Sequence, residues 1–145
     1  MLNPHKFKYN ELYWDIAYAA SLQSVANRRK VGAVVVTPTG MMSIGWNGTP
    51  VGFSNGCEDA TGKTIPEVIH AERNAIDKMT RQGVPVQGSL LFVTTAPCFE
   101  CAKAIHGLGF QAVIYDETYH NKLGIELLEQ AGVPVFARTE RFSLI

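Results

Sequence analysis

Four residues of this sequence have both the types and the spacing to hold and use a metal ion: His70, Glu72, Cys98 and Cys101. Zinc accepts imidazole and thiolate ligands, and a Cys-x-x-Cys pair in the first turn of a helix presents both sulfur atoms on one side. Three protein ligands leave the fourth tetrahedral position of zinc open, as in catalytic sites. The spacing therefore predicts one catalytic Zn²⁺ per chain, held by His70, Cys98 and Cys101.

Glu72 is the candidate catalytic residue. Two thiolates neutralise much of the zinc charge, so the metal acidifies water only weakly and a separate base is needed. A carboxylate two residues after His70 can take a proton from water and deliver protons to the substrate and the leaving group. Residues two apart on a regular helix point about 200° away from each other. The role therefore requires both residues to lie at the very start of a helix.

The two short motifs differ in strength when they are taken separately. A lone Cys-x-x-Cys also occurs in redox pairs and in structural zinc sites. Together, His-x-Glu and Pro-Cys-x-x-Cys are the signature of zinc-dependent nucleobase deaminases. An alternative of another class is a nucleotide-binding module with purely structural zinc. That module would need a fourth ligand, and neither Cys57 nor another histidine is placed to supply one.

Periodicity along the chain predicts nine helices and strands in the order α-β-β-α-β-α-β-α-β. Asn10 is expected to cap the first helix. The predicted strands are 31–36, 41–46, 89–95, 111–115 and 133–137, and the later helices are 67–79, 98–108 and 122–130. A long loop, 48–66, separates the hairpin from the second helix. This order predicts an α/β fold, a three-layer α/β/α sandwich with a mixed five-stranded sheet and helices on both faces.

Length and composition narrow the class of protein further. With 145 residues, the chain is expected to form one domain, residues 1–145. Thirteen basic and thirteen acidic residues give a net charge of zero, which argues against a nucleic-acid partner. The absence of a signal-like start and of a long apolar run favours the cytoplasm, or the host cytoplasm for a phage protein. Three cysteines in a reducing compartment favour metal binding over disulfides.

Longer motifs resemble those of one enzyme family. The resemblance rests on Gly45-Trp-Asn-Gly-Thr-Pro-Val-Gly52, Ile69-His-Ala-Glu-Arg-Asn-Ala-Ile76, Thr94-Thr-Ala-Pro-Cys-Phe-Glu-Cys101 and Tyr115-Asp-Glu-Thr-Tyr-His120, and it covers most of the chain. The sequence resembles the deoxycytidylate (dCMP) deaminases, particularly the short phage-like members of the zinc-dependent cytidine and deoxycytidylate deaminase family. The resemblance implies a cytidine deaminase-like fold and hydrolysis of dCMP to dUMP and ammonia, a step in dTTP precursor supply.

The resemblance also implies roles for residues outside the metal site. Asn47 would hold the deoxyribose, Ala71 and Ala96 would present backbone groups to the pyrimidine, and Arg28 and Tyr119 would meet the 5′-phosphate. Cys57 is expected to be a small apolar residue rather than a ligand.

Regulation is a further implication of the resemblance. It implies a homohexamer that dCTP activates and dTTP inhibits, through an effector site that includes Gly48, Gly52 and Asn55, with Mg²⁺ accompanying the bound triphosphate.

A tRNA adenosine deaminase is the alternative enzyme, because it shares the zinc motifs and a Gly-Trp-Asn segment. Such an enzyme should have a basic surface for RNA, and the zero net charge does not favour one. We therefore predict a small nucleotide, and not tRNA, as the substrate.

Overall fold

A five-stranded sheet organises residues 3–144, which the computed structural model describes. Its strands are β1 (Gly32–Val36), β2 (Met42–Trp46), β3 (Leu90–Thr95), β4 (Ala112–Glu117) and β5 (Val135–Ala137), and its helices are α1 (Asn10–Ser21), α2 (Ala71–Arg81), α3 (Phe99–Gly107) and α4 (Leu123–Gln130), with a 3₁₀ turn at Phe7–Tyr9. The strand order is β2-β1-β3-β4-β5. β1 runs antiparallel to β2 and β3, whereas β3, β4 and β5 are mutually parallel.

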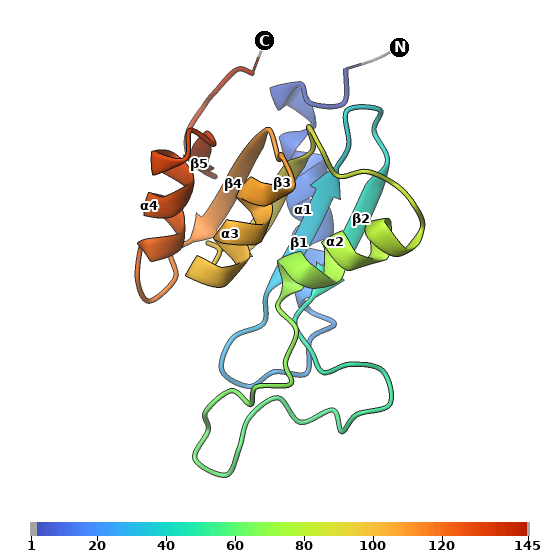
Figure 1. Cartoon of the computed structure of the whole chain (residues 1–145), viewed down its shortest axis with the longest axis vertical. Coiled ribbons are helices and arrows are strands. Elements are labelled where there is room, and N and C mark those ends of the chain that lie inside the picture. Colours follow the sequence, from blue (N-terminus) through green and yellow to red (C-terminus); the bar gives the residue numbers. More distant parts are fainter. Residues whose placement is uncertain (1–2, 145) are drawn as a thin grey trace.

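Helices cover both faces of this sheet. Figure 1 shows α1 behind the strands and α2, α3 and α4 in front of them. On the α1 face, Trp14 packs with Val34, Phe92 and Ile114 in one apolar cluster. A second cluster on the opposite face joins the three other helices to inward side chains of β1, β3 and β4. The predicted three-layer α/β/α sandwich, a mixed five-stranded sheet with helices on both faces, is confirmed.

The burial of each strand follows its residue types. Every residue of β1 and β3 is buried, which explains their continuous runs of β-branched and other apolar residues. β2 instead alternates exposed and buried positions up to Gly45, as expected for a strand at the sheet edge. Within residues 3–144, no helix combines the length and hydropathy that are needed to cross a membrane.

Most bounds of helices and strands differ by one or two residues from those expected from the sequence, and the starts of α1 and α2 differ for identifiable reasons. α2 begins at Ala71 rather than at position 67, because Ile69 and Gly48 exchange backbone hydrogen bonds of 2.8 and 3.1 Å that keep the chain extended. Asn10 lies inside α1 and does not cap it, since the 3₁₀ turn runs directly into the helix and Tyr9 takes the cap position. The Asn10 Oδ1 atom is buried and has no hydrogen-bond partner among the described residues.

The carboxyl ends of β3 and β4 define the functional edge of the sheet. β3 has a parallel neighbour in β4 and an antiparallel neighbour in β1, and ligands of open α/β sheets bind outside the carboxyl ends of strands where the order changes. The Ala96 N–H donates to the Glu117 carbonyl at 2.8 Å and holds the two strand ends together. The loops that follow β2 and α1 extend beyond the same edge (Figure 1).

We predict that Gly45→Ala destabilises the fold while Gly48→Ala does not. A Cβ atom at Gly45 would lie 2.4 Å from the Ala71 carbonyl oxygen, whereas one at Gly48 would meet no described atom within 4 Å. Overpacking of this kind typically lowers the free energy of unfolding by about 1–3 kcal/mol. Urea denaturation should therefore show a lower free energy of unfolding for Gly45→Ala alone. Equal stability of the two variants would contradict the close approach of β2 and α2.

Candidate active site

The three predicted metal ligands come together at the N-termini of α2 and α3. His70 is the N-cap residue of α2, Cys98 is the N-cap residue of α3, and Cys101 lies in the first turn of α3. The His70 Nδ1 atom is 3.5 Å from the Cys98 sulfur and 3.4 Å from the Cys101 sulfur. Zn–S bonds of about 2.3 Å and a Zn–N bond of about 2.0 Å at tetrahedral angles separate nitrogen from sulfur by about 3.5 Å. The donor set therefore fits zinc.

Three ligands make up this group. The His70, Cys98 and Cys101 donor atoms all lie within 4.8 Å of one another, and no fourth His, Cys, Asp or Glu of residues 3–144 joins them. Cys57 is buried elsewhere in the cavity wall, where its thiol contacts the Asn55 carbonyl at 3.7 Å. A closed site with four protein ligands is thus not formed within the described part of the chain.

The hydrogen bond between the two thiols shifts their pKa values in opposite directions. Hydrogen bonds from the Cys101 thiol and from His70 lower the Cys98 pKa to about 4. The Cys101 pKa is raised, because its proton is held against the Cys98 thiolate and because the thiol is buried. The Cys101 N–H also points to the Cys98 sulfur at 3.5 Å. A metal cation can replace the shared proton, and the helix N-termini favour the resulting anions.

Glu72 lies beside this group in the first turn of α2. Glu72 is 4% exposed, and this burial raises its pKa. Since His70 precedes the first helical residue with an extended backbone, the two side chains escape the divergence that a regular helix would impose. Both residues line the same cavity. A carboxyl group with a raised pKa at this position can accept a proton and release it again.

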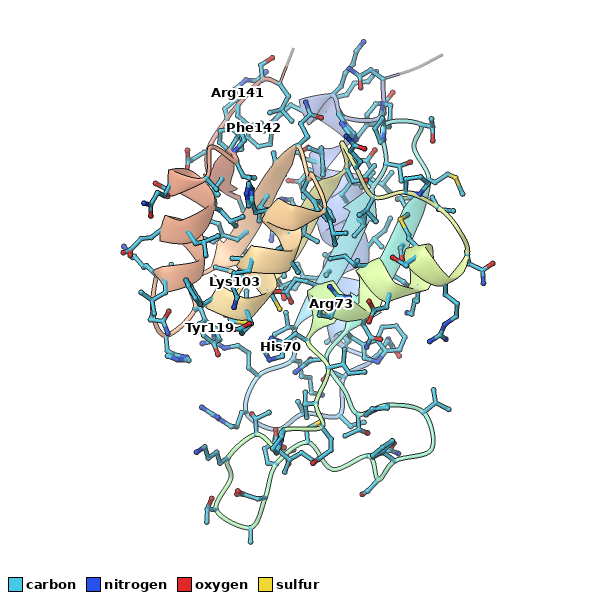
Figure 2. The ribbon with its side chains drawn as sticks, in the orientation of Figure 1. His70, Arg73, Lys103, Tyr119, Arg141 and Phe142 are labelled. Carbon is cyan, nitrogen blue, oxygen red and sulfur yellow. The ribbon has the colours of Figure 1, made fainter. Side chains whose placement is uncertain are left out.

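A cavity of about 300 Å³ extends from the metal group to the surface. The five residues expected to bind substrate all lie in its wall: Arg28, Asn47, Ala71, Ala96 and Tyr119. Figure 2 shows His70 and Tyr119 at the end of the molecule that faces the long loops, far from Arg141 and Phe142. The structure therefore places the predicted substrate residues around one cavity that also reaches the metal ligands.

Asn47 also stabilises the backbone of the cavity wall. Its Oδ1 atom accepts a hydrogen bond from the Val31 N–H at 2.9 Å, and its Nδ2 atom donates to the Arg29 carbonyl at 2.8 Å. A side-chain amide has two N–H donors and two lone pairs, so one of each stays available for a ligand. Asn47 therefore fixes the backbone of residues 29–31 while it faces the cavity.

Two arginines lie near Tyr119 in the cavity wall. Burial and the charge of Cys98 raise the Tyr119 pKa, whereas the charges of Arg28 and Arg29 oppose that rise. The Arg28 Nη1 atom donates to Thr64 Oγ1 at 3.4 Å, and the Arg29 Nη1 atom donates to the Thr118 carbonyl at 3.3 Å. The two arginines and the phenol hydroxyl form a part of the cavity wall that is suited to an anionic group.

Glu58 and Thr64 are among the wall residues that sequence reasoning missed. Both lie in the long loop before α2, where no periodic pattern or metal-ligand spacing marks them. The proposed effector residues Gly48, Gly52 and Asn55 belong to the same loop but do not line the cavity. Gly52 has a φ of +91°, a conformation that glycine adopts without strain.

A mixed sheet that carries a His-Cys-Cys group and a buried glutamate at two helix N-termini defines the class of zinc-dependent deaminases. Residues 8–117 match the model of the "Cytidine and deoxycytidylate deaminase zinc-binding region". The chain belongs to this family of deaminase enzymes.

Individual relatives agree with this assignment. The deoxycytidylate deaminase of Enterobacteria phage T4 is 33% identical, over 84% of this chain and 86% of the relative. The ComE operon protein 2 of Bacillus subtilis is 35% identical, over 90% of this chain and 71% of the relative. The crystal structure of the dCMP deaminase from cyanophage S-TIM5, in complex with dCMP and dUMP, superposes with a TM-score of 0.87 at 42% identity and covers 91% of this chain and 98% of that one.

We predict that Cys101→Ser abolishes zinc binding and that Cys57→Ser leaves it intact. Loss of a ligand should weaken zinc binding at least about 100-fold, more than loss of a hydrogen-bond partner of a ligand does. Zinc content per chain can be measured by mass spectrometry after dialysis against a weak chelator. An equal loss in the Cys57 variant would place Cys57 among the ligands.

Proposed function

We propose that this chain hydrolyses dCMP to dUMP and ammonia. The observation that carries the proposal is one cavity whose wall includes residues of the zinc-type donor set and Glu72 together with two arginines and a tyrosine. This combination of groups suits a nucleotide whose base reacts while its phosphate is held. The similarity to phage dCMP deaminases supports the same substrate.

In the proposed reaction, Glu72 carries a proton from water to the substrate twice. Zinc, when bound, supplies a Lewis acid that lowers the pKa of water. Glu72 takes a proton from the attacking water as the C–O bond to C4 of cytosine forms, and it gives this proton to ring N3. It then moves the second water proton to the departing amino group as the C–N bond breaks. Water and dCMP thus become dUMP and ammonia, and Glu72 is regenerated as a carboxylate.

Backbone groups in the cavity wall complement the edge of cytosine. The Ala71 N–H belongs to the first turn of α2, where helix N–H groups lack partners within the helix. The Ala96 N–H is used by Glu117, which leaves the Ala96 carbonyl for a donor. We assign the Ala71 N–H to the cytosine O2 atom and the Ala96 carbonyl to the 4-amino group. Asn47 then faces the deoxyribose, and Arg28 and Tyr119 face the 5′-phosphate.

Regulation and assembly form a second part of the proposal. We propose that dCTP activates and dTTP inhibits the enzyme through Gly48, Gly52 and Asn55, with Mg²⁺ on the triphosphate, in a homohexamer. The exposed loop around Gly52 and the exposed apolar side chains of Met42, Ile44 and Phe53 support a binding and contact surface here. We also propose a single deaminase domain over 1–145, of which residues 1, 2 and 145 lie outside the described range.

Ammonia release by zinc-loaded protein tests the substrate. We expect dCMP to react with a kcat/KM at least about 100-fold above that of deoxycytidine, because the phosphate adds charge-assisted hydrogen bonds at Arg28 and Tyr119. The measurement is repeated with a tRNA anticodon stem and with dCTP or dTTP added. Turnover of the RNA alone would indicate the tRNA enzyme, and zinc-loaded protein without any turnover would indicate the structural-zinc module.

We predict that Glu72→Gln keeps zinc but loses at least about 100-fold in kcat, because general acid-base catalysis typically contributes that much. Glu100→Gln is the matched control, since Glu100 lies in the first turn of α3 but pairs outward with Lys103 at 2.8 Å. Full activity of the Glu72 variant with zinc bound would show that the proton carrier is another group.

A further inference from the structure

The segment that carries Arg28 has no regular structure of its own. Residues 22–31 connect α1 to β1, and side chains from other parts of the chain hold them in place. Ser24 Oγ donates to the Asn47 carbonyl at 2.9 Å, and the Asn47 amide bonds to Arg29 and Val31. These contacts fix the two ends of the segment. The backbone between them, at Asn27 and Arg28, depends on a different partner.

That partner is the carboxylate of Glu58. Its two oxygens each accept a hydrogen bond from the Asn27 N–H at 3.1 Å, and Oε2 also accepts from the Arg28 N–H at 3.3 Å. Hydrogen bonds from N–H groups to an ionised carboxylate are stronger than those between neutral groups. One side chain therefore orients two successive peptide units, including the peptide unit that leads into Arg28.

The loop presents Glu58 from a short hairpin, which we define as residues 57–65. A backbone bridge pairs Glu58 with Thr64, and the Ile65 N–H donates to the Cys57 carbonyl at 2.9 Å. At the hairpin tip, Asp59 Oδ1 accepts from the Thr61 and Lys63 N–H groups at 2.9 and 3.1 Å. The carboxylate is thus held on a folded unit and not on a free loop.

The same hairpin also contacts the charged end of Arg28. Thr64 Oγ1 accepts from the Arg28 Nη1 atom at 3.4 Å, and the backbone bridge makes Thr64 the direct neighbour of Glu58. Arg28 is therefore held at both ends, its main chain by Glu58 and its guanidinium by Thr64. All three residues line the cavity.

The carboxylate does not suit direct contact with a phosphate, since like charges repel. With both oxygens occupied by N–H donors, Glu58 instead acts through the main chain of Asn27 and Arg28. We propose that Glu58 is a positioning residue that sets the Arg28 side chain for the 5′-phosphate of the substrate. The inference rests on the proposed function, which gives Arg28 its phosphate role.

Kinetics with two substrates test this role on the zinc-loaded protein. We expect Glu58→Ala to raise KM for dCMP about tenfold or more with little change in kcat, because the misplaced guanidinium no longer meets the phosphate. Deoxycytidine lacks the phosphate, so its kcat/KM should change less than about twofold. Glu58→Gln keeps one carbonyl acceptor and should fall between wild type and Glu58→Ala.

Control variants separate positioning from loop stability. Glu67→Gln removes a carboxylate from the same loop outside the cavity wall and should leave both substrates unaffected. Asp59→Asn weakens the hairpin tip without touching Asn27 or Arg28, so it reports the effect of loosening the hairpin alone. In an Arg28→Gln background, adding Glu58→Ala should raise the KM for dCMP less than about twofold, because the two residues act as a unit.

The results distinguish failure of the inference from failure of the proposed function. Wild-type protein that handles dCMP and deoxycytidine equally has no phosphate subsite, and both proposals then fall. A wild-type preference for dCMP, with Glu58→Ala reducing kcat/KM equally for both substrates, would overturn the positioning role alone. The positioning role would also be overturned if Glu58→Ala raised the KM for dCMP by the same factor in the Arg28→Gln background as in the wild type.

Discussion

The meeting of two helix N-termini at one point is the constraint on which the catalytic end of the molecule depends. His70 and Cys98 are N-cap residues of α2 and α3, and their side chains meet although 28 positions separate them in the chain. Free N–H groups and the positive ends of two helix dipoles favour anionic sulfur and carboxylate at this point. The helix N-termini reduce the free-energy cost of burying Glu72 and Cys101, and a bound divalent cation would neutralise the remaining negative charge. Geometry and electrostatics of the site therefore have a common origin.

Close packing between the layers fixes where the two helices begin. β1 and β3 are buried along their whole length, so the sheet forms a rigid centre between the two apolar clusters. Glycines allow the closest approaches: a Cβ atom at Gly32 would lie 1.9 Å from the Ala17 carbonyl oxygen, and one at Gly124 would lie 2.1 Å from that of Pro97. Since Pro97 precedes Cys98, the start of α4 packs directly against the backbone that leads to a metal ligand.

A different kind of interaction holds the part of the cavity wall that carries the arginines. Residues 27–31 belong to no helix or strand, so the N–H and carbonyl groups of their backbone need other hydrogen-bond partners. The amide of Asn47 and the carboxylate of Glu58 supply them to residues 27–31. Regular elements thus position the reacting groups, whereas side-chain-to-backbone hydrogen bonds position the arginines.

Residue type and spacing determined the chemistry of this protein and the order of its elements. A Cys-x-x-Cys pair and a His-x-Glu pair are local patterns, and so are the periodicities of helices and strands. The tertiary structure decided what no local pattern contains. Pairing between Gly48 and Ile69 delays the start of α2 to Ala71, and the hairpin brings Glu58 to Arg28. Hydrogen bonds between segments that are distant in the sequence leave no periodic trace in it, so only the folded chain reveals them.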